Sequence, residues 1–385
     1  MHYFDNAATS FPKPKSVIQA MEQYFLNCGA NPGRSGHRLA VEAGRMIMKT
    51  REMLAELFNI RDSSHLVFTG NATEGLNTVF NGLLKKGDHV VTSSMEHNSV
   101  LRPLNALKGK GVDVTVVPAD TEGIIYVSEI SEAVTRKTKL VCVTHASNVT
   151  GAITDITDLG RVCREKKVRF MVDAAQTAGA IPVDVEAMNI DYLAFSGHKG
   201  LLGPQGTGGL YMRDPGDLSP LMCGGTGSLS DQETQPDFLP DRFESGTRNV
   251  IGIAGLGAAL EYLREEGVDN IMQRDRRYVG LMLDELRSVP GITVYGRKDP
   301  LAQTAVLSLT FDGLSSSEAG DILDKRFNIA VRIGLHCAPS AHRTIGTFPE
   351  GTVRFSWGPF TRERDIFRAV KSIKTLAREA QGKGA

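Results

Sequence analysis

Lys199 is the residue of this chain whose surroundings best suit covalent chemistry. It follows an apolar run, Tyr192–Phe195, and lies in a glycine-rich segment that contains one lysine and no acidic residue. A lysine at the end of a buried strand, beside small residues and a histidine, is partly desolvated, so its pKa falls and the neutral amine can attack a carbonyl. This stretch alone leaves open the alternative of a solvent-facing lysine on a glycine loop.

Asp173 is the acid that such a lysine needs if the carbonyl belongs to a cofactor. Pyridoxal phosphate binds a lysine as a Schiff base, and its ring nitrogen must stay protonated so that the ring can take up carbanion charge. Asp173 follows the apolar run Arg169–Val172, and a buried carboxylate there must be paired. The alternative is a helix N-cap for Ala174–Ala178.

The phosphate of that cofactor requires backbone N–H groups at the start of a helix, together with hydroxyl groups. The turn Thr69–Thr73 precedes a predicted helix and fits this need, while Ser196 and His198 are placed to close the other side. His97 follows another predicted strand, where it could lie over an aromatic ring. A purely structural histidine is the alternative at that position.

Cys337 differs from the other cysteines in its setting. The chain has five cysteines: Cys28, Cys142, Cys163, Cys223 and Cys337. No CxxC pair occurs, which argues against a zinc site, and the odd number argues against a disulfide framework. Cys337 has Arg332 and His342-Arg343 near it in sequence, and such a polar, basic, mobile loop lowers the pKa of a thiol and exposes it. The other four are predicted to be small core residues.

Arg354 lies in an apolar strand pattern, Val353–Ser356. An arginine in such a strand must be paired, and its planar fork suits a substrate carboxylate. An internal ion pair fits the pattern nearly as well. The sequence therefore leaves two kinds of partner open for this side chain.

These residues are positioned by strands and helices that alternate between residues 65 and 212. Apolar, β-branched strands that alternate with helices indicate an α/β fold with a mostly parallel sheet covered on both faces. The seven predicted strands are His65–Thr69, His89–Thr92, Val112–Val117, Leu140–Thr144, Arg169–Val172, Tyr192–Ser196 and Gly209–Met212. Ligands bind at the carboxyl ends of such strands. Polar clusters follow five of them, at Asn71–Glu74, Glu96–Asn98, His145–Asn148, Asp173–Gln176 and Ser196–Lys199.

The length of the chain, 385 residues, favours two domains. We predict an N-terminal arm at residues 1–12, a large domain at 13–262 and a smaller α+β C-terminal domain at 263–385. Ser228–Arg248 is polar and predicts a long loop. The other predicted elements are helices at Ser16–Leu26, Leu39–Phe58, Thr73–Leu84, Ser99–Leu107, Val127–Val134, Leu159–Lys166, Gly252–Glu266, Asn270–Ser288, Ser316–Arg326 and Arg362–Ala380, and strands at Ala305–Phe311, Ile329–Arg332 and Thr352–Phe355.

The composition argues against several classes of function. Lys+Arg and Asp+Glu both number 44, so the net charge indicates neither nucleic acid nor an acidic membrane surface as a partner. No apolar run approaches the ~20 residues that span a bilayer, and the first residues lack a signal-peptide pattern; we expect a cytoplasmic protein. The glycines of Gly252–Gly257 lie inside a helical pattern rather than after a strand, so they are predicted packing positions, and a nicotinamide-dependent dehydrogenase is disfavoured.

An ordered series of motifs then connects these residues to a known family. The motifs are YFDNAAT, GRSGHR, ATEGLN, EHNSVL, HASNVTGA, DAAQTAGAIPVDV, FSGHKGLLGPQGTGGLY, FESGTRN and RIGLHCAP. The series resembles the class V aminotransferase group of fold-type I pyridoxal phosphate enzymes, and within it the SufS-like branch of cysteine desulfurases and selenocysteine lyases. The match runs from Tyr3 to about Phe355 and implies the seven-stranded large domain and small C-terminal domain of that fold.

The resemblance implies a role for each candidate residue. Lys199 forms the Schiff base, Asp173 pairs with the pyridine nitrogen, Gln176 contacts the ring hydroxyl, and His97 stacks on the ring. The phosphate is bound by Thr73, Ser196, His198 and the backbone of Ala72, and Thr247 reaches the phosphate of the other subunit, which implies a homodimer. The residues expected at the substrate are Ala7, His37, Asn148, Arg332 and Arg354, with Asn148 also at the cofactor.

The implied reaction converts L-cysteine to L-alanine and leaves the sulfur as a persulfide on Cys337 for an acceptor protein. Alternatives within the same fold are a selenocysteine lyase acting on L-selenocysteine, a cysteine sulfinate lyase, and another class V lyase, aminotransferase or epimerase in which Cys337 is incidental. A non-catalytic scaffold of this fold is a remote alternative, because the lysine or its acid would be expected to be lost. Lys199, Asp173, His97 and Cys337 are all present.

Overall fold

A seven-stranded, mostly parallel sheet forms the centre of the protein, whose computed structural model describes residues 1–32, 36–216 and 218–382. The strands are β2 (Leu66–Thr69), β3 (His89–Ser93), β4 (Asp113–Val117), β5 (Thr138–Thr144), β6 (Arg169–Asp173), β7 (Tyr192–Ser196) and β8 (Gly208–Met212). Their order in the sheet is β2-β8-β7-β6-β5-β3-β4, and only β8 runs against its neighbours. All seven predicted strands are confirmed.

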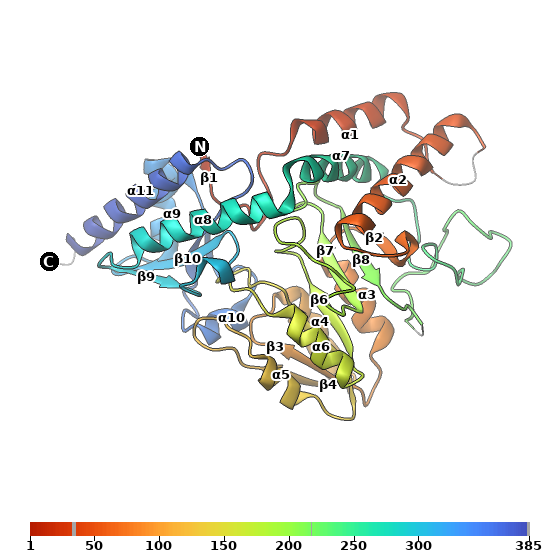
Figure 1. Ribbon diagram of the computed structural model, residues 1–385, viewed down its shortest axis with the longest axis horizontal. Helices are drawn as coiled ribbons and strands as arrows, with labels where there is room; N and C mark the ends of the chain where they lie inside the picture. Colours follow the sequence, from red (N-terminus) through yellow and green to blue (C-terminus); the bar gives the residue numbers. More distant parts are fainter. Residues whose placement is uncertain (33–35, 217, 383–385) are drawn as a thin grey trace.

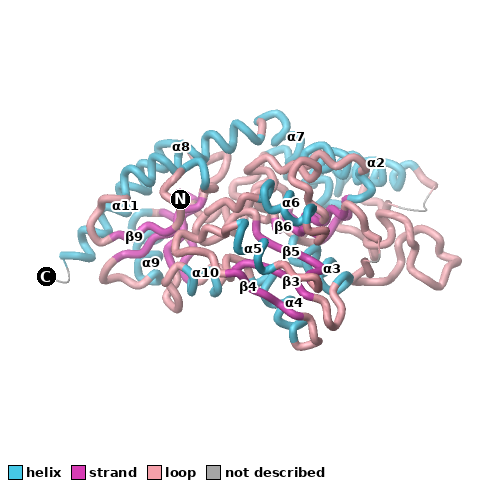
Figure 2. The backbone as a smooth tube through the Cα atoms, turned by 60° about the horizontal axis from the view of Figure 1, so that its bottom comes forward, coloured by secondary structure: helices cyan, strands magenta, loops and turns pink. Residues whose placement is uncertain are grey.

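Helices cover both faces of this sheet because alternate side chains of the strands are apolar on both sides (Figures 1 and 2). Val141 and Val143 of β5 join a core with α2, α5, α6 and α7, whereas Leu140 and Cys142 join a core with α3 and α4. The helices are α1 (Lys15–Asn27), α2 (Arg38–Leu57), α3 (Ala72–Leu83), α4 (Asn98–Lys108), α5 (Val127–Ala133), α6 (Ile156–Glu165) and α7 (Val250–Glu266).

A second, antiparallel sheet with the order β12-β13-β10-β9 lies beyond α7 in the chain. Strand β9 of this sheet was not predicted from the sequence. The predicted strand Ile329–Arg332 is divided between β11 and β12. The bounds are α8 (Val268–Leu286), β9 (Ile292–Tyr295), β10 (Val306–Phe311), α9 (Ser316–Phe327), β11 (Ile329–Ala330), β12 (Arg332–Gly334), α10 (Pro339–Thr344), β13 (Thr352–Ser356) and α11 (Glu363–Gly382). Short 3-10 turns occupy Ser63–His65 and Pro300–Ala302. The domain boundaries at 12/13 and 262/263 stay a prediction.

The N-terminal arm connects the two sheets. Its first strand, β1 (His2–Tyr3), pairs in parallel with β11, and Phe4 is buried in the core of the second sheet. Further along, the Ser10 amide donates a hydrogen bond of 3.0 Å to the carbonyl of His198. The arm therefore reaches from the second sheet to the segment that carries Lys199.

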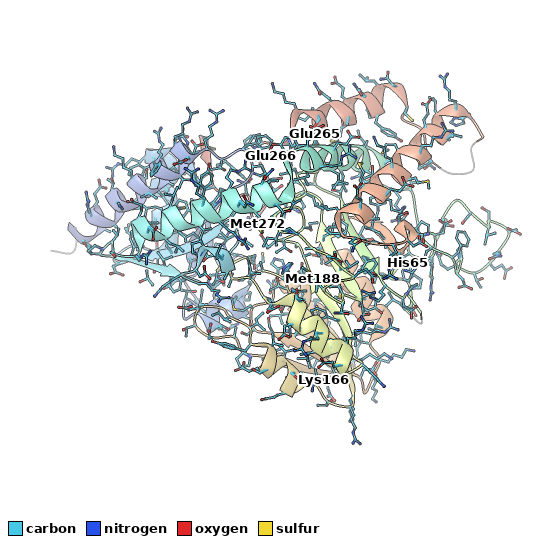
Figure 3. All side chains as sticks on the ribbon, viewed as in Figure 1. His65, Lys166, Met188, Glu265, Glu266 and Met272 are labelled. Atoms are coloured by element: carbon cyan, nitrogen blue, oxygen red, sulfur yellow. The ribbon has the colours of Figure 1, made fainter. Side chains whose placement is uncertain are left out.

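The glycines of α7 are packing positions, as predicted. A Cβ on Gly255 would lie 2.8 Å from Met21 of α1, and one on Gly257 would lie 2.7 Å from the hydroxyl of Thr50 in α2. Only glycine lets the three helices approach this closely, and Figure 1 shows α1 and α2 next to α7. Figure 3 labels Glu265 and Glu266 at the end of α7 and Met272 on α8, the helix that follows.

The segment between β8 and α7 contains no helix or strand among its described residues, which agrees with the predicted loop. It is the light green loop that extends from the body of the molecule in Figure 1. Within the described part of the chain, no helix has both the length and the apolar character needed to cross a membrane.

Candidate active site

Lys199 lies in the turn that follows β7, at the carboxyl edge of the central sheet. Burial lowers the pKa of its amine to about 8; Asp173 opposes this effect, and the positive charges of Arg354 and Arg332 add to it. The amine forms no hydrogen bond or salt bridge with the described residues. A substantial fraction of neutral amine is therefore available near neutral pH, as the sequence predicts, and the solvent-facing alternative is wrong.

Asp173 ends the neighbouring strand β6 and is only 3% exposed. Its Oδ1 accepts a hydrogen bond of 2.9 Å from the Ala175 amide, and no helix follows, so the alternative of an N-cap is wrong. Burial raises the pKa of this carboxyl, while the Ala175 amide and Lys199 lower it. Among the described residues no cation forms a salt bridge with Asp173, so a buried carboxylate is left for a cationic or N–H group of a ligand.

His97 follows β3 and caps α4. Its Nδ1 accepts from the Ser99 amide at 3.0 Å and lies 2.9 Å from the Ser99 hydroxyl, which leaves Nε2 to carry the ring proton. Burial and the nearby Lys199 lower the pKa of the imidazole to about 4, so the ring is neutral at neutral pH. The adjacent β3, β5, β6 and β7 thus bring His97, Asp173 and Lys199 to one edge of the sheet.

The predicted phosphate site lies at the N-terminus of α3. Asn71 caps this helix, and the amide of Ala72 donates to the Ser196 hydroxyl at 3.1 Å, which joins the two predicted sides of the site. Thr73 is exposed at the first turn. In this structure the amides of Ala72 and Glu74 donate to Ser196 and Asn71, so the helix start offers an anion the Thr73 amide and its positive dipole end.

Two further residues, His198 and Thr247, are predicted phosphate ligands. The Nδ1 of His198 is 3.1 Å from the Thr9 hydroxyl, and burial lowers the pKa of this imidazole to about 4. Thr247 is exposed in the loop before α7 and makes no hydrogen bond with the described residues of its own chain. Its exposure leaves the side chain available to a second subunit.

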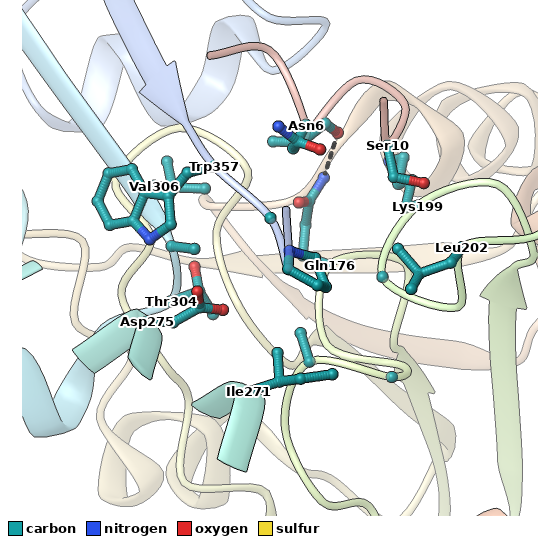
Figure 4. A pocket seen from close by; sticks show the side chains of 17 residues that line it. Asn6, Ser10, Gln176, Lys199, Leu202, Ile271, Asp275, Thr304, Val306 and Trp357 are labelled. Carbon is teal, nitrogen blue, oxygen red and sulfur yellow. Dashed lines mark hydrogen bonds between the residues drawn. The ribbon is translucent and has the colours of Figure 1, made fainter. Parts of the chain in front are cut away.

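A cavity of about 50 Å³ opens beside Lys199 and is bounded by Ala7 of the arm and Gln176. Figure 4 shows Gln176 pointing toward the arm, where its Nε2 donates to the carbonyl of Ala7 at 3.1 Å. Asp275 and Trp357 close the cavity on the far side. Gln176 and Ala7 are thus brought to Lys199, as predicted.

Arg354 is 2% exposed and forms the internal ion pair that the sequence left open. Its Nη2 lies 2.9 Å from Oδ1 of Asp5, and its Nη1 donates to the carbonyl of Asn148 at 2.9 Å. Arg332 is exposed, 3.9 Å from the other oxygen of Asp5. His37 instead caps α2, where its Nδ1 accepts a hydrogen bond from the Ala40 amide at 3.3 Å, and residues 33–35 of its motif lie outside the described residues.

Cys337 is exposed, and hydrogen bonds hold its own backbone carbonyl and that of the preceding residue, His336. The Asn148 side chain donates to the carbonyl of His336 at 2.8 Å, and the Asn98 amide donates to that of Cys337 at 2.8 Å. His336 and Cys337 have φ values of +48° and +58°, a strained arrangement that persists only where the surroundings hold it.

The prediction of a mobile loop around Cys337 is wrong for the residues that follow it. Ala338 is buried and α10 follows at once, with Ala341 and His342 buried in turn, because these side chains have an apolar core to pack against. The prediction that the other cysteines are core residues holds for two of them. It is wrong for Cys223, which is exposed, and for Cys28, which is half-buried. Cys223 lies in the segment between β8 and α7, and Cys28 follows the last residue of α1.

Sequence reasoning missed two polar residues at this site. Asp5 lies in the quoted motif YFDNAAT, but only the pairing of the arm with β13 reveals its contact with Arg354. Glu96 precedes His97 and is fully buried; its Oε1 accepts from the Ser93 hydroxyl at 2.5 Å and from the Thr144 amide at 3.0 Å. The signal that could have identified Glu96 is its position, as an acid between a predicted strand and the candidate histidine.

A mostly parallel sheet covered by helices, with a lysine of lowered pKa and a buried acid at its carboxyl edge, is the arrangement of an α/β enzyme. The family model for Aminotransferase class-V matches residues 2–368, and the chain belongs to that family. The fold-type I architecture expected from the resemblance is confirmed.

Two relatives have names that include cysteine desulfurase. A protein of Methanothermobacter thermautotrophicus, named "Probable cysteine desulfurase", is 37% identical over 98% of this chain and 95% of the relative. The cysteine desulfurase of Escherichia coli K12 is 34% identical over 87% of this chain and 84% of its own.

Solved structures agree in fold. The apo cysteine desulfurase of Thermococcus onnurineus NA1 superimposes with a TM-score of 0.92 at 34% identity, covering 98% of this chain and 94% of the other. The cysteine desulfurase CsdA of E. coli has a TM-score of 0.87 at 30% identity, with the same coverage.

Proposed function

We propose that the protein is a pyridoxal phosphate-dependent cysteine desulfurase that converts L-cysteine to L-alanine and passes the sulfur, as a persulfide on Cys337, to an acceptor protein. The observation that carries the proposal is the anchoring of the backbone at Cys337: the Asn98 amide and the Asn148 side chain bind the carbonyls of Cys337 and His336, while the thiol stays exposed. A carrier thiol must be exposed to the acceptor and close to the substrate at once, and this loop satisfies both needs.

The residues present fit the cofactor. Asp173 is a buried acid without a salt-bridge partner among the described residues, which suits a protonated pyridine nitrogen, and the free amine of Lys199 suits the Schiff base. His97 would lie over the ring and Gln176 would contact its hydroxyl. When bound, pyridoxal phosphate supplies the carbonyl for the amine and an electron sink for the α carbon. The phosphate would be held by Ala72, Thr73, Ser196 and His198, with Thr247 of a second subunit.

The side chains of this chain then have distinct tasks. Lys199, with a pKa of about 8, can accept the α proton of the amino acid as a neutral amine. His97 is neutral and can hold a proton on Nε2 toward the substrate, because Nδ1 is occupied by the Ser99 amide. The thiolate of Cys337 forms an S–S bond with the substrate sulfur as the C–S bond breaks. The electron pair of that bond stays with the three-carbon fragment, which takes up protons and leaves as alanine.

The test is a visible spectrum of the purified protein followed by addition of L-cysteine with a thiol reductant present. We expect a cofactor band near ~420 nm that changes on addition, with alanine and sulfide forming in equal amounts. The variant C337A should keep the band and lose desulfuration of cysteine. Full cysteine activity in C337A would refute the role of the thiol, and the absence of a band after addition of the cofactor would refute the assignment of Lys199.

The main alternative is selenocysteine cleavage. The weaker carbon–selenium bond makes a carrier thiol less necessary, so C337A would retain activity on L-selenocysteine under that alternative. Transamination or racemisation without release of sulfur would instead indicate another class V activity. The cytoplasmic location and the acceptor protein stay predictions.

We also propose a homodimer whose phosphate site is completed by Thr247. Support comes from exposed apolar side chains on α1 and α2, where Phe25 is 72%, Leu26 71% and Met48 58% exposed. Exposed apolar groups of this size are typical of a surface that a partner covers. Sedimentation should give twice the mass of the chain, and T247A should release the cofactor more readily than the wild type. A monomer that retains the cofactor fully would contradict this proposal.

A further inference from the structure

His342 is a fully buried imidazole on α10, the short helix that follows Cys337 (Figure 1). Its Nδ1 lies 2.7 Å from the Thr347 hydroxyl, and its Nε2 has no hydrogen-bond partner in the part of the chain that the structure describes. Burial of a polar ring with one nitrogen unsatisfied is costly. A contact that offsets this cost therefore has to come from what the ring packs against.

The ring of His336 is that contact. The two ring centroids lie 5.3 Å apart, with an angle of 47° between the planes. His336 is 5% exposed, and its Nε2 lies 3.0 Å from the Thr352 hydroxyl of β13, whereas its Nδ1 has no partner among the described residues. A single hydrogen bond lets a ring turn about it, so the packing of His342 supplies the second constraint on the position of His336.

Both rings are uncharged at neutral pH. Burial lowers the pKa of His336 to about 2 and that of His342 to about 4, and the positive charge of Arg354 adds to both shifts. Two imidazolium rings at this distance would repel each other, but two neutral rings do not. The pair therefore stays packed over the pH range in which the thiolate chemistry takes place.

His336 is the residue directly before the carrier thiol, and its backbone is strained. His336 and Cys337 have φ values of +48° and +58°, which persist only where several supports hold them. The bonds from Asn98 and Asn148 to the two carbonyls are one support, and they come from the segments after β3 and β5. The side chain of His336 is the other, and it is held from β13 and α10.

We propose that His342 is a positioning residue for the carrier thiol: by packing against His336, it keeps the Cys337 peptide in the left-handed conformation from which the thiolate reaches the sulfur of the substrate. The inference rests on the proposed function, because it assumes that Cys337 takes up this sulfur. His342 is fully buried and acts only through His336. Its loss should slow the transfer of sulfur to Cys337 and leave binding of the amino acid unaffected.

The experiment compares H342A with the wild type, both loaded with pyridoxal phosphate. Persulfide on Cys337 is followed by mass spectrometry after addition of L-cysteine without reductant, and binding of the product L-alanine is followed by titration of the visible absorbance. We expect persulfide formation to slow by at least about tenfold, because misplacement of a reacting group is costly in rate, and the affinity for L-alanine to stay unchanged. An unchanged rate, or an equal loss in both measurements, would overturn the proposal.

The matched control is H89A. His89 is also a buried histidine beside a threonine hydroxyl, with 2.7 Å between its Nδ1 and Oγ1 of Thr138. It is the first residue of β3, at the end of the strand opposite to His97. H89A should keep the wild-type rate of persulfide formation. An equal loss of rate in H89A would show that removal of any buried histidine slows the reaction, and would overturn the proposal.

Two further variants keep the test decisive if H342A does not fold. H342N has an amide group in place of Nδ1, so it can keep the bond to Thr347 without the ring; it should show the slow persulfide formation. H342F keeps a ring against His336 and loses that bond; it should form the persulfide faster than H342N. A wild-type rate in H342N, or a slower rate in H342F than in H342N, would overturn the proposal.

A double variant tests whether His342 acts through His336. H336A and H336A/H342A should form the persulfide at the same rate, because the second substitution then has nothing left to disturb; a further loss in the double variant would overturn the proposal. A wild-type protein that forms no persulfide on Cys337 would overturn the proposed function and this inference together. A wild type that forms it, with an unaffected H342A, overturns the inference alone.

Discussion

Replacement of Glu96 by glutamine should stabilise the protein in a strongly pH-dependent way. Burial raises the pKa of the Glu96 carboxyl from 4.5 to about 8, and the charge of Asp173 adds to the increase, against hydrogen bonds from Ser93 and Thr144. The folded state therefore keeps the proton over a range in which the unfolded chain has lost it. Glutamine resembles the protonated acid and has no proton to lose.

The sign and size of the effect follow from linkage. A carboxyl whose pKa is raised by folding costs nothing below pH ~4.5, and the stability of the wild type then falls by about 1.4 kcal/mol per pH unit until pH ~8. The E96Q variant should be more stable than the wild type by a margin that grows by about 3 kcal/mol between pH ~5 and pH ~7. A constant offset from the new amide group does not affect this slope.

The assay is urea denaturation of the two proteins, prepared with the same cofactor content, at several pH values between ~5 and ~8. The matched control is Glu52→Gln, which makes the same substitution at an exposed position of α2. A difference between E96Q and the wild type that stays constant over this range would refute the reasoning, because Glu96 would then be ionised in the folded protein.

The remaining predictions concern the acid, the helix packing and the exposed thiols. D173N should lower kcat of the desulfuration reaction by at least about a hundredfold, since the cofactor ring would lose its charged partner; near-normal kcat would contradict that role. G257V should destabilise the protein by about 1–3 kcal/mol in urea titrations, because its Cβ would meet the Thr50 hydroxyl 2.7 Å away, and unchanged stability would contradict the close packing. C223S should keep full activity although Cys223, like Cys337, is exposed; inactivation by C223S would put the carrier role of Cys337 in question.

Much of the site could be predicted because its residues lie at the ends of strands. Apolar runs indicate where β6 and β7 are buried, and a parallel sheet brings consecutive carboxyl ends to one edge, so Asp173 and Lys199 had to lie near each other. Burial of an amine or a carboxyl in such a place shifts its pKa in a direction that the sequence pattern already indicates.

The segment after Cys337 could not be predicted in the same way. Its polar composition is typical of a loop, yet Ala338 and Ala341 find apolar neighbours across the fold and α10 forms. Short helices of this kind depend on tertiary contacts more than on their own propensity. The four-residue strand β9 also depends on tertiary contacts, because it is defined by its pairing with β10.

The sequence by itself determined the α/β class, the edge of the sheet at which the candidate residues gather, and the identity of Lys199, Asp173, His97 and Cys337 as candidates. These features depend on local periodicity and on residue types that lie close together in the chain. Only the tertiary structure decided which partner Arg354 takes, because Asp5 lies 349 positions away and is delivered by the pairing of the arm with the second sheet. Contacts between distant segments arise from packing and strand order, which a short stretch of sequence does not reveal.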